Sequence, residues 1–152
     1  MEFDASSLLA ALKAYPQNDG LAEPHLWNAL SLLKQSLPEK AWIGFYRYEE
    51  KLGCLVLGPF QGTPACEKIA LGKGVVGACY QKKGTVCVPD VSKFPGYICC
   101  DASAASELCL YLEEADAVLD IDYPLGASFE GQIPFYEEAA KILDRLFSCT
   151  RK

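Results

Sequence analysis

Hydrophobic residues recur along this chain with two different periods, and the change between them divides it into predicted elements. In the N-terminal third they recur every three or four residues, which is typical of amphipathic helices. A first helix is predicted to be capped by Ser6 or Ser7 and to end near Ala14. A second is predicted from about Leu21 to Leu37. Beyond it, apolar and polar residues alternate, which indicates β-strands.

The rest of the chain is predicted to hold strands, a short helix, a long loop and a final helix. The predicted strands are Trp42–Tyr48, Cys54–Gly58, Glu67–Leu71, Thr85–Pro89, Glu107–Leu112 and Ala115–Ile121. The short helix spans about Val75 to Gln81, and the final amphipathic helix runs from near Pro134 to Cys149. A long loop from Val91 to Ser106 is of the length that is usually functional or disordered. This order favours one α+β domain over residues 1–152, built on an antiparallel sheet.

The composition is that of an ordinary globular chain with an acidic balance. Of its 152 residues, 51% are hydrophobic, and the net charge is -6. A nucleic-acid partner and an anionic membrane surface both require positive charge, so neither is expected. No apolar stretch is long enough to cross a membrane, and the acidic start Met1-Glu2-Phe3-Asp4 does not resemble a secretory signal. We therefore expect a cytoplasmic protein whose eight cysteines are mostly free thiols.

Two adjacent cysteines, Cys99 and Cys100, follow a Pro-Gly turn in the long loop. An exposed loop thiol can ionise and act as a nucleophile, whereas a buried cysteine is often only a small hydrophobic residue. The second interpretation is the simplest for Cys54, Cys79, Cys87, Cys109 and Cys149. No CxxC pair is present, and the single histidine, His25, lies in a predicted helix. Neither a metal site nor a histidine-dependent hydrolase is therefore favoured.

Two carboxylates lie in an otherwise apolar predicted strand. Asp120 and Asp122 project from the same face, about 7 Å apart along the strand. Crowded carboxylates repel each other, so at least one is expected to have a raised pKa and to be able to donate a proton. Alternatively, both lie at the end of the strand and cap the turn that begins at Tyr123. The spacing alone does not decide between these interpretations.

The first predicted strand places Trp42, Gly44 and Tyr46 on one face, which predicts two rings flanking a hole at the glycine. Such rings can wall a small-molecule pocket, although alternate aromatic residues are more often plain core. The segment Gly72-Lys73-Gly74 precedes a helix and is similar to an anion-binding turn. It lacks the full phosphate-loop pattern, which disfavours a nucleotide but leaves a small carboxylate as a ligand of its amides.

Several short motifs together resemble the free methionine-R-sulfoxide reductases, single-domain enzymes of the GAF fold. They occur in the family order and cover most of the chain between about Trp42 and Asp122. The matching segments are Trp42-Ile43-Gly44-Phe45-Tyr46, Leu57-Gly58-Pro59-Phe60-Gln61-Gly62, Pro64-Ala65-Cys66, Gly72-Lys73-Gly74-Val75, Pro89-Asp90-Val91, Phe94-Pro95-Gly96, Cys100-Asp101, Ser106-Glu107 and Val118-Leu119-Asp120-Ile121-Asp122. The resemblance implies a GAF domain that reduces free L-methionine-(R)-sulfoxide without a cofactor. Its central antiparallel sheet is packed by the N- and C-terminal helices.

The resemblance also implies roles for two cysteines. Cys100, which directly precedes Asp101, matches the catalytic cysteine of the family. Cys66 matches a cysteine that recycles it through a disulfide, with a thioredoxin-type protein as the reductant. A homodimer is compatible with the resemblance. Many members carry a third cysteine where this chain has Val76, so a route through that thiol is lost and Cys66 is the expected partner.

Further site residues follow from the same resemblance. The acidic pocket of the family matches Glu107, Asp120 and Asp122, and its aromatic wall matches Trp42 and Tyr46. Loop amides around Cys100, with Asp101 and Ser103, are expected to bind the substrate carboxylate.

Some alternatives stay open. Cys79 or Cys87 is an alternative resolving thiol, and the role of Cys99, which replaces a small residue of the family, is undefined. Tyr97 stands where the family often has histidine, so no histidine acts there. The alternative function is a non-catalytic GAF module that binds a small ligand or senses oxidants through its thiols.

Overall fold

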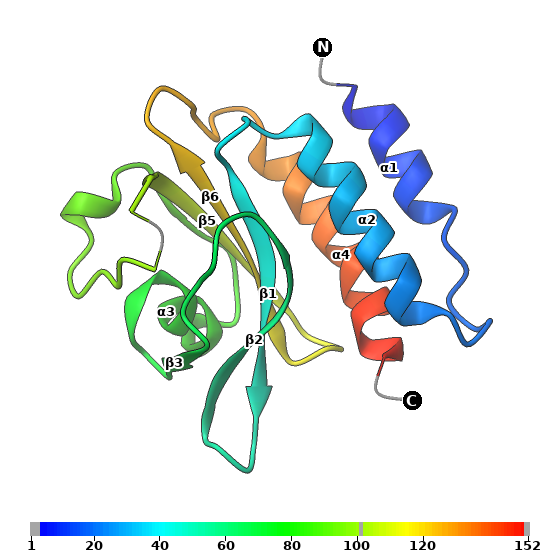
Figure 1. Ribbon diagram of the computed structural model, residues 1–152, viewed down its shortest axis with the longest axis horizontal. Helices are drawn as coiled ribbons and strands as arrows, with labels where there is room; N and C mark the ends of the chain where they lie inside the picture. Colours follow the sequence, from blue (N-terminus) through cyan, green and yellow to red (C-terminus); the bar gives the residue numbers. More distant parts are fainter. Residues whose placement is uncertain (1–3, 101, 151–152) are drawn as a thin grey trace.

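An antiparallel sheet separates two layers of the molecule (Figure 1). The structure is a computed structural model that describes residues 4–100 and 102–150. In this part of the chain the six strands lie in the order β3-β2-β1-β6-β5-β4. They are β1 (Trp42–Glu49), β2 (Cys54–Gln61), β3 (Lys68–Ala70), β4 (Val86–Val88), β5 (Ala104–Leu112) and β6 (Ala117–Pro124). The helices are α1 (Ala5–Lys13), α2 (Ala22–Ser36), α3 (Gly74–Lys82) and α4 (Ile133–Cys149), with a 3-10 turn at Val91–Lys93.

The predicted α+β architecture is confirmed, and the differences lie at the ends of elements. Helix α1 is capped by Asp4, whose side chain accepts a hydrogen bond from the Ser7 amide at 3.1 Å, and not by a serine. The loop expected from Val91 to Ser106 is shorter, because β5 begins at Ala104 and pairs there with Pro124 of β6. Both strands of this hairpin are therefore longer than the sequence predicts.

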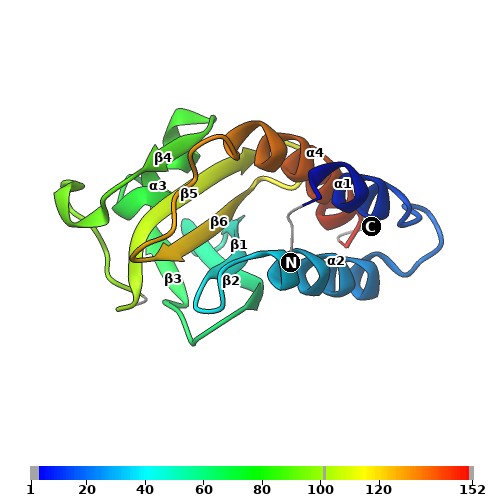
Figure 2. The same ribbon diagram turned by 90° about the horizontal axis from the view of Figure 1, so that it is seen from above.

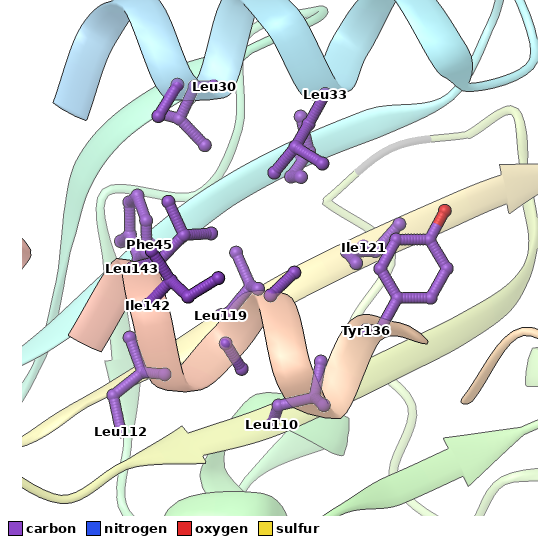
Figure 3. Close-up of a cluster of buried hydrophobic side chains, with 14 of the residues drawn as sticks. Leu30, Leu33, Phe45, Leu110, Leu112, Leu119, Ile121, Tyr136, Ile142 and Leu143 are labelled. Carbon is purple, nitrogen blue, oxygen red and sulfur yellow. The ribbon is translucent and has the colours of Figure 1, made fainter. Parts of the chain in front are cut away.

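Helices α1, α2 and α4 cover one face of the sheet, and α3 lies on the other (Figure 2). On the face of α2 and α4, side chains such as Phe45 and Leu119 pack against Leu30, Leu33 and Leu143 (Figure 3). All of these side chains are fully buried. Burial of each of these side chains stabilises the fold by about 1.5–3 kcal/mol. This core therefore fixes the position of the sheet, whose opposite face carries the site. Among the described helices, none is long and apolar enough to cross a membrane.

The opposite face carries a second apolar cluster around α3. The hole expected at Gly44 is not open, and that prediction is wrong. A Cβ atom added to Gly44 would lie 2.5 Å from the Trp42 ring and 2.4 Å from the Cβ atom of Phe60. Because Gly44 has no side chain, Trp42 folds over it and stacks on Phe60, with 5.4 Å between ring centroids.

Candidate active site

A small, partly open cavity lies between the sheet, the first turn of α3 and the loop that carries Cys100. Its volume is about 20 Å³, which is room for about one water molecule. The side chains that line it come from β1, β5, β6, α3 and the segments around residues 65–69 and 97–100. They are Trp42, Tyr46, Ala65, Ile69, Gly74, Val75, Val76, Tyr97, Ile98, Cys100, Glu107, Asp120 and Asp122.

A disulfide joins Cys66 to Cys100, with 5.3 Å between their Cα atoms. Cys100 lines the cavity, and Cys66 follows β2, so the bond ties the loop to the neighbourhood of the sheet edge. Cys79 and Cys87, the alternative partners, are free thiols, and so is the exposed Cys99. The pair that the resemblance implies is thus the pair that the structure bonds.

Two buried rings form one wall of the cavity, as the resemblance implies. Trp42 and Tyr46 are 2% and 1% exposed, and their ring centroids lie 6.2 Å apart. The indole Nε1 of Trp42 donates to the Thr63 carbonyl at 2.9 Å. The hydroxyl of Tyr46 donates to the Cys66 carbonyl, also at 2.9 Å. Strand β1 therefore fixes both rings and, through Tyr46, the backbone of the cysteine that bonds Cys100.

Carboxyl groups line the cavity beside these rings, since Trp42 of β1 pairs directly with Asp122 of β6. Glu107 of β5 pairs directly with Asp122 of β6, and Asp120 pairs with Cys109 one step along the same two strands. Glu107 and Asp120 are 5% exposed, and Asp122 is 8% exposed. The alternative in which Asp120 and Asp122 cap a turn is wrong, because β6 continues to Pro124 and carries both of them inside the sheet.

The buried acids favour their protonated forms. Burial raises the pKa of Glu107 to about 8, and the nearby charge of Asp122 contributes to the shift. Burial, and then the charge of Glu107, raises the pKa of Asp120 well above its usual value. Among the described residues that line the cavity, no lysine, arginine or histidine offsets these effects. A carboxyl group that keeps its proton near neutral pH can donate it during a reaction.

Curated proteins and solved structures include several relatives of this chain. No family model matches the chain. Over 141 residues it is 38% identical to the free methionine-R-sulfoxide reductase of Saccharomyces cerevisiae, covering 84% of this chain and 76% of the relative. The chain belongs to the free methionine-R-sulfoxide reductase family. The crystal structure of the free methionine-R-sulfoxide reductase from Neisseria meningitidis in complex with its substrate agrees, with a TM-score of 0.85 at 31% identity over 99% of this chain and 95% of that one.

A structural match also identifies the fold. A solved GAF domain matches with a TM-score of 0.73 at 33% identity, covering 94% of this chain and 89% of that one. The GAF fold implied by the motifs is therefore confirmed. Membership of the free methionine-R-sulfoxide reductase family identifies the chain as a thiol oxidoreductase and favours it over the non-catalytic GAF module.

Cys109 contacts two of the acids that line the cavity, although the sequence predicts only a core residue. Its Sγ lies 3.4 Å from Oε2 of Glu107 and 3.3 Å from Oδ1 of Asp120. Burial raises its pKa well above the usual value, so it stays a thiol. The signal was the alternation in β5, which places Cys109 on the face of Glu107, opposite the face of Leu108 and Leu110.

The expected carboxylate-binding loop is only partly described. Asp101 lies outside the described residues. Ser103 is exposed and is not among the residues that line the cavity, so its role stays a prediction. The amide of Cys100 donates to the Ile98 carbonyl at 3.1 Å and is not available for a ligand there.

The start of α3 meets the cavity where the sequence suggested an anion-binding turn. The amides of Gly72 and Lys73 donate to the carbonyls of Gly77 and Ala70. The first residues of α3, Gly74 to Val76, line the cavity. The amides of a first helical turn have no partner within the helix and favour an anion. Gly74 has a φ of +61°, and a Cβ there would meet the Ile98 side chain at 3.2 Å, so the loop packs directly on this helix start.

Neither His25 nor a metal offers a competing chemistry in the described residues. His25 lies on α2, across the sheet from the cavity, where its ring bonds Asp19 at 2.8 Å. Glu107, Cys109 and Asp120 bring possible donor atoms within 4.8 Å of one another. Their protonated forms are favoured, however, and metal binding needs a thiolate and ionised carboxylates. The arrangement suits proton transfer better than it suits a cation.

Proposed function

We propose that this chain reduces free L-methionine-(R)-sulfoxide to L-methionine, with Cys100 as the nucleophile and Cys66 as the resolving thiol. The observation that carries the proposal is the Cys66–Cys100 disulfide beside a cavity lined by carboxyl groups and aromatic rings. The disulfide is the state that the enzyme would reach after one turnover. The names of the relatives, one of them crystallised with its substrate, point to the same reaction.

The reaction consumes two thiols and one sulfoxide. The Cys100 thiolate attacks the sulfoxide sulfur while the sulfoxide oxygen takes up a proton. The protonated oxygen then moves from the substrate sulfur to the Cys100 sulfur as the bond between the two sulfurs breaks. Methionine leaves with its sulfur reduced by two electrons, and Cys100 is left as a sulfenic acid. The Cys66 thiol then attacks the Cys100 sulfur, which forms the disulfide and releases the oxygen as water. A thioredoxin-type dithiol reduces the disulfide and restores both thiols.

Glu107 is the proposed proton donor. Its pKa of about 8 keeps it protonated at neutral pH and still allows it to lose the proton during the reaction. We assign Asp120 and Asp122 to contacts with the substrate ammonium group. Its positive charge would favour the ionised carboxylate and so oppose the burial that raises the pKa of Asp120.

The remaining parts of the cavity fit the rest of an amino-acid substrate. Trp42 and Tyr46 would enclose the methyl-thioether end, since aromatic rings contact sulfur favourably. The start of α3 would bind the substrate carboxylate. A cavity that binds both the ammonium and the carboxylate group selects the free amino acid over a peptide-bound residue, which lacks them.

The volume of the cavity fits the disulfide state of such a cycle. About 20 Å³ cannot hold methionine sulfoxide. We propose that reduction of the Cys66–Cys100 bond releases the loop, so that Tyr97 and Ile98 withdraw and admit the substrate. In a cell, this reaction would repair oxidised free methionine in the cytoplasm.

A substrate panel tests the proposal. Purified protein is given dithiothreitol and either epimer of free methionine sulfoxide, or N-acetylmethionine-(R)-sulfoxide, and the reduced product is quantified by chromatography. Only the free R epimer should be converted. Conversion of both epimers at similar rates, or of the N-acetyl compound, would contradict the proposed binding of ammonium and carboxylate. No conversion of any substrate would contradict the proposed reaction itself.

A further inference from the structure

Cys109 lies behind the carboxyl groups of the cavity and does not line it. The residue is fully buried in β5, and its Sγ is within hydrogen-bond distance of both Glu107 and Asp120, at 3.4 and 3.3 Å. Because Asp120 is its direct partner across β5 and β6, the sheet itself holds this thiol against the acids. Nothing in the proposed cycle uses it, since Cys66 and Cys100 account for both electrons.

The chemistry of the three groups makes the hydrogen bond depend on the reaction. A thiol carries one proton and donates it to one acceptor at a time. A hydrogen bond to an ionised carboxylate is stronger than one to a neutral carboxylic acid. The contact from Cys109 to Glu107 is therefore weak while Glu107 is protonated and becomes stronger once Glu107 has given its proton to the sulfoxide oxygen.

We infer that Cys109 is a positioning residue for the proton donor: its thiol donates to the Glu107 carboxylate that proton transfer leaves behind, and so stabilises it. The inference rests on the proposed role of Glu107. The proton of Cys109 stays on sulfur throughout, so the atom and electron balance of the cycle is unchanged. An interaction that is stronger after proton transfer than before lowers the barrier to that transfer.

Other groups that titrate face the same acids and stay in place in the test. They are Asp120 and Asp122 from β6, Tyr46 from β1, Cys79 from α3 and Tyr97 from the loop. Hydrogen bonds from Cys109 lower the pKa of Glu107 and of Asp120, against the larger effect of burial. Removal of the thiol alone is thus expected to make Glu107 a weaker acid.

The test compares the pH dependence of kcat in Cys109→Ala and Cys109→Val with that of the unaltered chain. Loss of the hydrogen bond should move the alkaline fall in kcat up by about 0.7 pH unit. Because the proton is only partly transferred in the transition state, kcat on the plateau should fall about twofold. Cys109→Val fills the space with methyl groups that exclude water. Cys109→Ser keeps a donor and should restore the alkaline fall toward its original pH.

Cys79 provides a matched control. It is a buried thiol in the same apolar cluster, but its hydrogen bond goes to the Gly84 carbonyl at 3.1 Å and not to a carboxyl group. Cys79→Ala removes the same atom from the same side of the sheet. It should leave the pH of the alkaline fall unchanged, whatever it does to the melting temperature.

An alkaline fall that stays in place in both Cys109→Ala and Cys109→Val, with kcat merely reduced, would overturn the inference. Infrared spectroscopy tests the contact without turnover. The S–H band assigned by its loss in Cys109→Ser should move to lower frequency as pH rises through the titration of Glu107, and a band that does not move would overturn the hydrogen bond. An inactive unaltered chain would refute the proposed function instead, and the infrared result would still decide the contact.

Discussion

Glu107 is a buried acid whose protonated form is favoured in the folded state. Replacement by glutamine removes the ionisable group and keeps the size and shape of the side chain. The glutamine amide is always neutral, and its two N–H donors can replace the acid proton toward Asp120 and Asp122. The substitution therefore imitates the protonated state at every pH. We expect Glu107→Gln to be more stable than the unaltered chain at neutral and alkaline pH, and much less active.

The size of the effect follows from the pKa of Glu107, which burial raises from 4.5 to about 8. Between these values the folded state binds a proton that the unfolded state has released. Stability from this group is therefore complete below about pH 4.5 and is lost as pH rises toward about pH 8, at about 1.4 kcal/mol per pH unit. The Glu107→Gln variant has no ionisable group at this position and therefore does not lose this stability as pH rises. Its advantage in unfolding free energy should grow by about 3 kcal/mol between about pH 5.5 and about pH 7.5.

Urea unfolding of both proteins across this pH range measures the difference. A phosphine reductant keeps all cysteines as thiols, so that disulfide exchange does not disturb the baselines. The same preparations are assayed for turnover, which should fall by at least about 100-fold in Glu107→Gln, because general acid catalysis contributes that much. A stability difference that stays constant with pH would refute the raised pKa. Full activity of the variant would refute Glu107 as the proton donor.

Three other predictions concern the same wall of acids and rings. The kcat of the unaltered chain should fall about tenfold between about pH 7 and about pH 9, because Glu107 loses its proton near pH 8; a flat stopped-flow profile would contradict this. Tyr46→Phe removes the hydrogen bond to the Cys66 carbonyl and should slow disulfide formation more than methionine release, as measured by thiol trapping after one turnover. Gly44→Ala places a methyl group against the Trp42 ring and should lower the melting temperature and raise KM, whereas an unchanged KM would show that the ring does not contact substrate.

Much of this fold is predictable because its hydrophobic periods are regular. The alternation in β5 and β6 and the apolar stripes of α2 and α4 predict an α+β domain with an antiparallel sheet. The ends of elements are less predictable. Asp122 falls inside β6 because it pairs with Trp42 of β1 and with Glu107 of β5, and those pairings depend on register rather than on local sequence.

In the candidate site, too, some features follow from the local sequence and others depend on strand register or side-chain rotamers. Asp120 and Asp122 are predictable as a pair from their spacing in one strand. The contact of Cys109 with Asp120 is not, because it requires the register of β5 against β6. The position of Trp42 over Gly44 depends on side-chain rotamers that no periodicity specifies. The pairing of Cys66 with Cys100 was implied by the resemblance alone, since nothing in the spacing separates Cys66 from Cys79 or Cys87.

We expect Cys100 to attack the sulfoxide and Cys66 to make the reaction repeatable. The most direct measurement is methionine formed per chain from free methionine-(R)-sulfoxide, with a thioredoxin-type protein as the sole reductant. Cys66→Ser should form about one methionine per chain and stop, whereas Cys100→Ser should form none. Cys99→Ser, which alters the exposed neighbour, should turn over repeatedly like the unaltered chain. Repeated turnover by Cys100→Ser would contradict the account.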